Sequence, residues 1–274
     1  MREHERETVD FEVWPEAIEL GEMFAEEGYE LALVGGPVRD LLLHRRSHDL
    51  DFCTSARPEQ FEPILRRWGH DGFWDMGRKF GTLGAMRRRP DGTEVQVEIT
   101  TYRSDEYDPD SRKPEVSYGD SLEGDLSRRD FTVNAMALRV PDLEFVDPFG
   151  GANDLSKRVL RTPVDPRQSF DDDPLRMMRA VRFVAQLGFG IEPETAEAIC
   201  TMADRLGIVS AERVRDELVK LLLSDRPRAG IEAFVDSGLA DVVFPEIPAL
   251  QLEIDEHHRH KDVFEHTMIV IDRA

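Results

Sequence analysis

The stretch from Leu33 to Asp51 constrains the fold of this 274-residue chain more than any other. An apolar run ends at Gly35 and Gly36, a short helix follows over Pro37 to His44, and a second strand begins at Asp49. A glycine pair before a helix lets an anion approach backbone N–H groups, and helix N-termini attract anions. The stretch therefore predicts a strand, turn, helix and strand with a place for phosphate.

The second strand carries two carboxylates. Asp49 and Asp51 stand two residues apart, so both point to one face and Leu50 to the other. Adjacent carboxylates repel unless a cation lies between them, and hard oxygen ligands suit Mg²⁺ bound with substrate phosphates. A lone pair of this kind is more often part of a solvated edge strand. Glu98 would add a third carboxylate if the strand over 94–100 pairs beside the first two.

Arg39, in the short helix, completes this set. Phosphate, guanidinium and metal are the three parts that nucleotidyl transfer by two metals requires. For the glycine pair alone, the alternative is a tight turn between strand and helix. The combination with the two aspartates favours a site for a nucleoside triphosphate and its metals.

The composition bounds the class of protein. The net charge of −21 argues against nucleic acid as a partner, but residues 57–89 hold eight basic and four acidic side chains, which leaves a local basic groove possible. No apolar run approaches the roughly 20 residues that cross a bilayer, and the polar start lacks a signal peptide's apolar core. We expect a cytoplasmic protein without membrane contact. Cys53 and Cys200 are far apart and predict two buried thiols.

The pattern of apolar residues predicts an α+β fold in two parts. We expect a head with a mixed sheet over residues 1–150, a helical neck over 151–224 and the start of a helical body over 225–274. Residues 128–138 predict a helix, whereas residues 103–120 lack periodicity and predict a long mobile loop. Such a loop is functional or disordered in most compact domains.

Several motifs, in order, resemble those of class II tRNA nucleotidyltransferases and bacterial poly(A) polymerases of the DNA polymerase β-like superfamily. The resemblance is greatest to bacterial CCA-adding enzymes. The five motifs are Gly35–Asp40 with Asp49 and Asp51, Arg128–Met136, Asp147–Leu155, Asp172–Phe183 and Ser210–Arg213. Together they extend over about residues 30–215, too many matches for coincidence.

The resemblance implies template-independent addition of CMP and AMP to the 3′ end of tRNA, with CTP and ATP as donors and pyrophosphate as product. It implies that Gly35, Gly36 and Arg39 bind the triphosphate and that Asp49 and Asp51 bind two Mg²⁺ ions, with Glu98 in support. It also assigns Arg129 and Asp130 to the ribose, where a carboxylate could accept from the 2′-hydroxyl.

Base choice is predicted to lie in the fourth motif. On a continuous helix, Asp173 and Arg176 would share a face. The carboxylate would accept from the amino group of C or A, and the guanidinium would donate to the adjacent ring nitrogen. U and G carry a carbonyl oxygen in place of that amino group. Asp172 departs from the family's usual Glu, and Arg179 would help to orient the base or the phosphates.

Two alternatives remain open from the sequence. A poly(A) polymerase, or an enzyme that adds only CC or only A, shares these motifs, and an inactive nucleotide- or RNA-binding fragment is a rival of another class. The histidines in 257–266 resemble the opening of an HD phosphohydrolase-like region, but the His-Asp pair that should follow is absent. We therefore expect no metal there, and a chain shorter than the family's full length.

Overall fold

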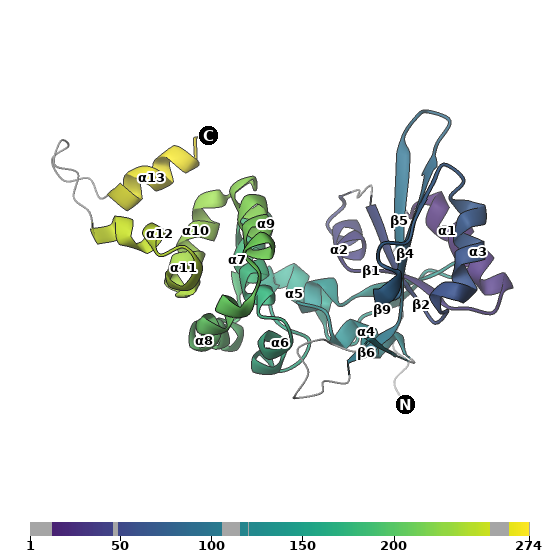
Figure 1. Ribbon diagram of the computed structural model, residues 1–274, viewed down its shortest axis with the longest axis horizontal. Coiled ribbons are helices and arrows are strands. Elements are labelled where there is room, and N and C mark those ends of the chain that lie inside the picture. Colours follow the sequence, from purple (N-terminus) through teal and green to yellow (C-terminus); the bar gives the residue numbers. More distant parts are fainter. Residues whose placement is uncertain (1–12, 46–48, 106–115, 120, 253–262, 274) are drawn as a thin grey trace. The chain divides into compact units, whose positions relative to one another are not determined.

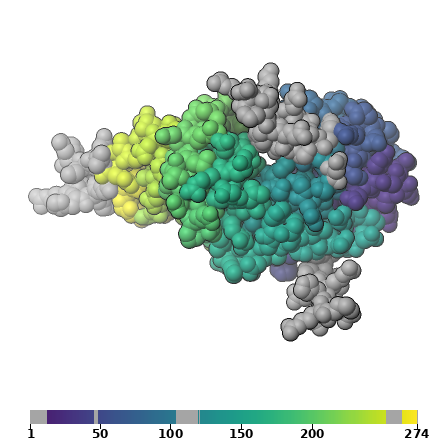
Figure 2. Space-filling view, turned by 90° about the horizontal axis from the view of Figure 1, so that it is seen from below, coloured from purple at the N-terminus to yellow at the C-terminus, as the bar shows by residue number. Residues whose placement is uncertain are grey.

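The computed structural model describes residues 13–45, 49–105, 116–119, 121–252 and 263–273 (Figure 1). The chain forms two compact units. Unit 1 comprises residues 1–127 and 134–152, and unit 2 comprises residues 128–133 and 153–274. In Figure 2 the purple and blue surface belongs to unit 1 and the yellow surface to unit 2. The sequence thus leaves unit 1, enters unit 2 for six residues and returns before it finally passes into the helices.

A seven-stranded mixed sheet forms the centre of unit 1, in the order β3-β4-β5-β2-β1-β8-β9. β2 and β5 run parallel, and the other neighbours are antiparallel. The α+β class predicted from the sequence is confirmed. The strands of this sheet are β1 (Leu31–Val34), β2 (Asp49–Thr54), β3 (Gly72–Trp74), β4 (Thr82–Arg88), β5 (Glu94–Thr101), β8 (Ala137–Val140) and β9 (Glu144–Val146).

Two helices cover the apolar side of this sheet. Helix α1 (Pro15–Glu26) packs against β1 and β8, and α3 (Pro58–Trp68) packs against β4. Both begin with proline at the first helical turn, where the missing N–H costs nothing. Phe24 and Phe61 join the two helices, with ring centroids 6.0 Å apart. Apolar residues of β5 alternate with exposed polar ones, so polar side chains gather on the opposite side.

The remaining elements of unit 1 are short. Helix α2 (Gly36–Leu42) follows β1, the 3₁₀ turn η1 (Arg78–Phe80) precedes β4, and α4 (Leu122–Ser127) ends the first segment. The predicted loop begins and ends in β6 (Arg103–Asp105) and β7 (Val116–Tyr118), which pair with each other. Residues 106–115 of that loop lie outside the described residues.

The prediction of a helix over residues 128–138 was wrong. Thr132–Asn134 form a 3₁₀ turn, η2, and Ala137–Val140 form β8, which pairs with β1. Every residue from Asp130 to Leu138 is buried. A run that is buried throughout occurs in strands as well as in helices, and periodicity alone does not separate the two.

Within its described residues, unit 2 is helical apart from the two-stranded pair β10 (Val159–Leu160) and β11 (Gly190–Ile191). Helix α7 packs against both α9 and α10. Among the described residues, no helix is both long and apolar enough to cross a membrane. The helical elements are α5 (Gly151–Lys157), α6 (Pro166–Asp172), α7 (Leu175–Leu187), α8 (Pro193–Met202), η3 (Ala203–Ile208), α9 (Ala211–Leu222), α10 (Pro227–Asp236), α11 (Leu239–Val243), α12 (Glu246–Ala249), η4 (Leu250–Leu252) and α13 (Val263–Ile271).

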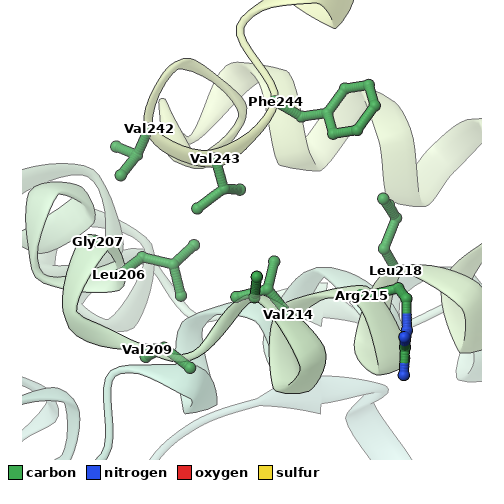
Figure 3. A pocket seen from close by; sticks show the side chains of 10 residues that line it. Leu206, Gly207, Val209, Val214, Arg215, Leu218, Val242, Val243 and Phe244 are labelled. Atoms are coloured by element: carbon green, nitrogen blue, oxygen red, sulfur yellow. The ribbon is translucent and has the colours of Figure 1, made fainter.

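A cavity of about 380 Å³ lies among η3, α9 and α11 of unit 2 (Figure 3). Its lining is mainly aliphatic, and Val214 and Val243 point toward each other across it. The guanidinium of Arg215 points away (Figure 3) and pairs with Asp216 at 2.8 Å. None of the predicted site residues lines this cavity.

The arginines of the basic stretch over residues 57–89 are extensively paired with acids. In unit 1, Arg89 and Arg87 form ion pairs with Glu16 and Glu19 of α1, both at 2.5 Å. Arg88 pairs with Glu94 at 2.6 Å. Much of the local positive charge is therefore compensated, which weakens the hypothesis of a basic groove.

The prediction for the cysteines was half right. Cys53 is buried in the core of unit 1, whereas Cys200 on α8 is exposed. Three of the C-terminal histidines, at positions 257, 258 and 260, lie outside the described residues.

Candidate functional site

The Gly35 turn begins the site. Gly35 has φ 71° and ψ −133°, a backbone conformation that is strained for residues with a Cβ atom. β1 and β2 are antiparallel with Leu33 opposite Phe52, so the end of β1 lies beside the start of β2. The turn and the carboxylates of β2 therefore meet at one edge of unit 1.

Arg39 is fixed in place beside this turn. Its Nη1 donates to Asn134 Oδ1 at 2.8 Å, and its Nε and Nη2 donate to Asp40 Oδ1 at 2.9 and 2.8 Å. Only 11% of the side chain is exposed. Sequence reasoning missed Asn134 as a partner, although it lies within the second motif.

Asp49 and Asp51 project from the exposed face of β2. Both are exposed, whereas Leu50 and Phe52 are 1% and 2% exposed, as the alternation predicted. The condition on which Glu98 depended is met, because Asp51 lies opposite Glu98 in the parallel β2–β5 ladder. Asp49, Asp51 and Glu98 line a cavity of about 320 Å³.

This donor set fits Mg²⁺ that arrives with a nucleotide. Within the part of the chain that the structure describes, no three His, Cys, Asp or Glu side chains form a ready metal site. Mg²⁺ usually takes one or two carboxylates, with water and substrate phosphates completing its shell. Asp49 and Asp51, exposed on one side of a strand and opening on a cavity, meet that requirement.

Residues 128–133 belong to unit 2, and Asp130 is bound there to α7. Arg179 Nε donates to Asp130 Oδ2 at 2.7 Å, while Asp130 Oδ1 accepts the N–H of Phe131 at 2.8 Å. Asp130 is buried, and its negative charge raises the pKa of the Arg179 guanidinium. The neighbouring Arg129 is half-buried. A residue predicted for the ribose and one predicted for the base thus contact each other.

Asp173 and Arg176 do not share a helix, so that prediction was wrong. Helix α6 ends at Asp172, Asp173 is extended at φ −143° and ψ 98°, and α7 begins at Leu175. Pro174 explains the break, because proline disfavours helical geometry in the residue before it. Asp173 Oδ1 accepts the N–H of Leu175 at 3.2 Å.

Further contacts fix the groups of the fourth motif. Arg213 Nη2 donates to Asp173 Oδ2 at 3.0 Å, so a residue of the fifth motif fixes the carboxylate of a residue of the fourth. Arg176 donates to Ser169 Oγ at 2.8 Å and to the carbonyl oxygen of Arg128 at 2.6 Å. Asp172 accepts from Gln168 at 2.7 Å. Arg213 lies 40 residues from Asp173 in sequence, so no local pattern predicted their contact.

The third motif has structural contacts in both units. In unit 1, the carboxylate of Asp147 accepts the N–H groups of Gly151 and Ala152, at 2.6 and 3.0 Å. In unit 2, Asp154 accepts from Thr132 Oγ1 at 2.6 Å and from Arg161 at 2.8 Å. Each aspartate therefore stabilises the local backbone of its own unit.

Comparison with known proteins gives two family matches. Residues 31–161 match the family described as "Poly A polymerase head domain". Residues 188–250 match the family described as "Probable RNA and SrmB- binding site of polymerase A".

Curated relatives include the CCA-adding enzymes of Lactobacillus johnsonii, 40% identical over 233 residues, and of Streptococcus pneumoniae serotype 19F, 42% identical over 236 residues. These alignments cover 85% and 86% of this chain and 56% of each relative. The chain thus spans a little over half the length of the curated relatives it matches.

Solved structures agree. The CCA-adding enzyme of Bacillus stearothermophilus in complex with CTP is 37% identical, with a TM-score of 0.72, over 83% of this chain and 53% of that one. The Thermotoga maritima CCA-adding enzyme complexed with tRNA is 26% identical, with a TM-score of 0.68, over 94% and 63%. The shared head domain, the ordered motifs and these likenesses place the chain in the family of tRNA nucleotidyltransferases and poly(A) polymerases.

Proposed function

We propose that this chain adds CMP and AMP to the 3′ end of tRNA without a nucleic-acid template, using CTP and ATP and releasing pyrophosphate. The observation that carries the proposal is the exposure of Asp49 and Asp51 on one face of β2, beside the Gly35 turn. The relatives are named as CCA-adding enzymes, and solved relatives are described with CTP and with tRNA.

In this proposal, unit 1 supplies the residues for the reacting phosphates. Gly35 and Gly36 let the triphosphate approach the backbone. Arg39 adds positive charge, and a phosphate would compete with the Asp40 carboxylate for the Arg39 guanidinium. Asp49 and Asp51 would hold Mg²⁺, with Glu98 in support. Bound there, the metal would stabilise charge on the phosphates and on the attacking 3′-oxygen. The residues themselves position the triphosphate in line with that oxygen.

Asp130 would select ribonucleotides. Its carboxylate accepts from Arg179 and from the N–H of Phe131, and a 2′-hydroxyl would donate to the same carboxylate. Arg179 holds the carboxylate in one orientation, and Arg129 adds a donor near the ribose. A deoxyribonucleotide would offer no hydroxyl to this acceptor.

Asp173 and Arg176 would read the base. Arg213 fixes the carboxylate of Asp173, which would accept from the amino group of C or A. Arg176 is oriented by Ser169 and by the Arg128 carbonyl, and a guanidinium has five N–H donors, so it can also donate to a ring nitrogen. Asp172 and Arg179 would orient this pair. UTP and GTP would be rejected because their carbonyl oxygen faces a carboxylate.

Poly(A) polymerase activity is the second candidate, and the head-domain match favours it by name. An enzyme that adds only CC or only A has the same motifs. The test incubates the 274-residue chain with Mg²⁺, tRNA lacking its CCA end and each labelled NTP, singly and mixed. Addition of C and then A supports the proposal, whereas A alone on any RNA supports the polymerase. Nucleotide binding without transfer supports the inactive fragment.

A further inference from the structure

Trp74 lies in the same row of the sheet as Glu98 and Asp51. Trp74 on β3 is opposite Gly84 on β4, Gly84 is opposite Glu98 on β5, and Glu98 is opposite Asp51 on β2. Residues directly opposite in neighbouring strands point to the same face. The row therefore leads from the indole ring of Trp74 to Asp51, one of the two proposed metal ligands, across four adjacent strands.

Gly84 leaves the space that the indole occupies. A Cβ atom at position 84 would lie 2.0 Å from Trp74 Cε2 and 2.2 Å from Trp74 Nε1, distances that no packed structure tolerates. Gly84 is not among the positive-φ residues, so its backbone conformation does not require glycine. Glycine inside a strand costs stability and often marks a close approach. Here the group that approaches is the tryptophan ring.

The ring reaches the carboxylate of Glu98. Trp74 Nε1 donates to Glu98 Oε1 at 3.4 Å, a long hydrogen bond, so the packing over Gly84 sets its geometry more than the bond itself does. An exposed glutamate on a strand would otherwise sample several rotamers. Glu98 also lines the cavity that contains Asp49 and Asp51. Because Glu98 Oε1 is held toward β3, the positions that Glu98 Oε2 can take are restricted.

We propose that Trp74 is a positioning residue that orients Glu98 for cation binding beside Asp51, with Gly84 as the platform for its ring. This inference rests on the proposed function, because it assumes that Asp51 holds a cation. Trp74 acts only through Glu98. Its effect must therefore disappear when Glu98 no longer carries a charge.

The test measures Mn²⁺ affinity of the full chain by calorimetry and by the electron paramagnetic resonance signal of free Mn²⁺. Loss of one weak hydrogen bond predicts that Trp74→Phe binds Mn²⁺ about threefold to tenfold more weakly. Gly84→Ala, which displaces the ring, should weaken binding similarly. Trp14→Phe makes the same exchange at the buried tryptophan before α1 and should leave the affinity unchanged. Circular dichroism confirms that each variant folds.

A double-mutant cycle separates positioning from general packing. Adding Trp74→Phe to Glu98→Gln should cause no further loss, because the residue that Trp74 positions is already neutral. If Asp51→Asn loses Mn²⁺ binding but Trp74→Phe binds as tightly as the wild type or more tightly, the inference on Trp74 is overturned and the cation site stands. If the wild type and Asp51→Asn bind alike, the cation site itself fails.

Discussion

Removal of the buried carboxylate of Glu217 should destabilise unit 2 selectively. Arg182 Nε on α7 lies 2.6 Å from Glu217 Oε2 on α9, and the two side chains are only 10% and 5% exposed. Glu217→Gln leaves a buried guanidinium without its counter-charge, which typically costs about 3–5 kcal/mol. Gln186 still accepts from Arg182 at 3.0 Å, so we expect the lower end, about 3 kcal/mol. For a unit of this size that corresponds to a fall in Tm of roughly 10 °C.

The chain offers an internal control for this experiment. All three tryptophans, Trp14, Trp68 and Trp74, belong to unit 1. In urea unfolding, far-UV circular dichroism should report the early loss of unit 2, while tryptophan fluorescence should keep its midpoint. Arg182→Met with Glu217→Leu should regain most of the stability, because no charge stays buried. A single variant that loses less than about 1 kcal/mol, or a double variant no more stable than the single, would refute this reasoning.

Four further predictions concern unit 1 and the ribose contact. Asp51→Asn should abolish nucleotidyl transfer and leave Tm unchanged, since Asp51 is exposed. Residual transfer in the tRNA assay would contradict the assignment of Asp51 as a metal ligand. Gly35→Ala should raise the KM for CTP in steady-state kinetics, because alanine in the strained conformation of this turn would cost about 1–3 kcal/mol. Asp130→Asn should lower ribo- over deoxynucleotide selectivity about tenfold in competition assays. The hydrogen bond from Arg89 lowers the pKa of Glu16 from its ordinary value, so unit 1 loses stability as pH falls through that lowered pKa. Arg89→Gln should flatten this loss in fluorescence-monitored urea unfolding.

The sequence by itself determined the features with a local period. The alternation over Asp49–Phe52 and over Glu94–Ile99 predicted which side chains face solvent, and the structure confirms it. The glycine turn and the helical second part were also predicted correctly. Each of these depends on neighbours only a few residues apart, and short-range periodicity records such contacts directly.

Tertiary structure decided which segments meet. Asp51 and Glu98 are neighbours only because β2 and β5 pair in parallel, which the sequence left as a condition. Residues 128–138 predicted a helix, but they contain a turn and the start of β8, because β8 pairs with β1.

The partners of the long charged side chains were decided in the same way. Arg179 could reach several carboxylates, and packing selected Asp130, 49 residues away in sequence. Asp173 was expected to pair along a helix with Arg176, but Pro174 ended that helix and Arg213 of α9 contacts Asp173 instead. Sequence spacing predicts contacts within one element, whereas contacts between elements follow from how buried surfaces fit together, which no local pattern encodes.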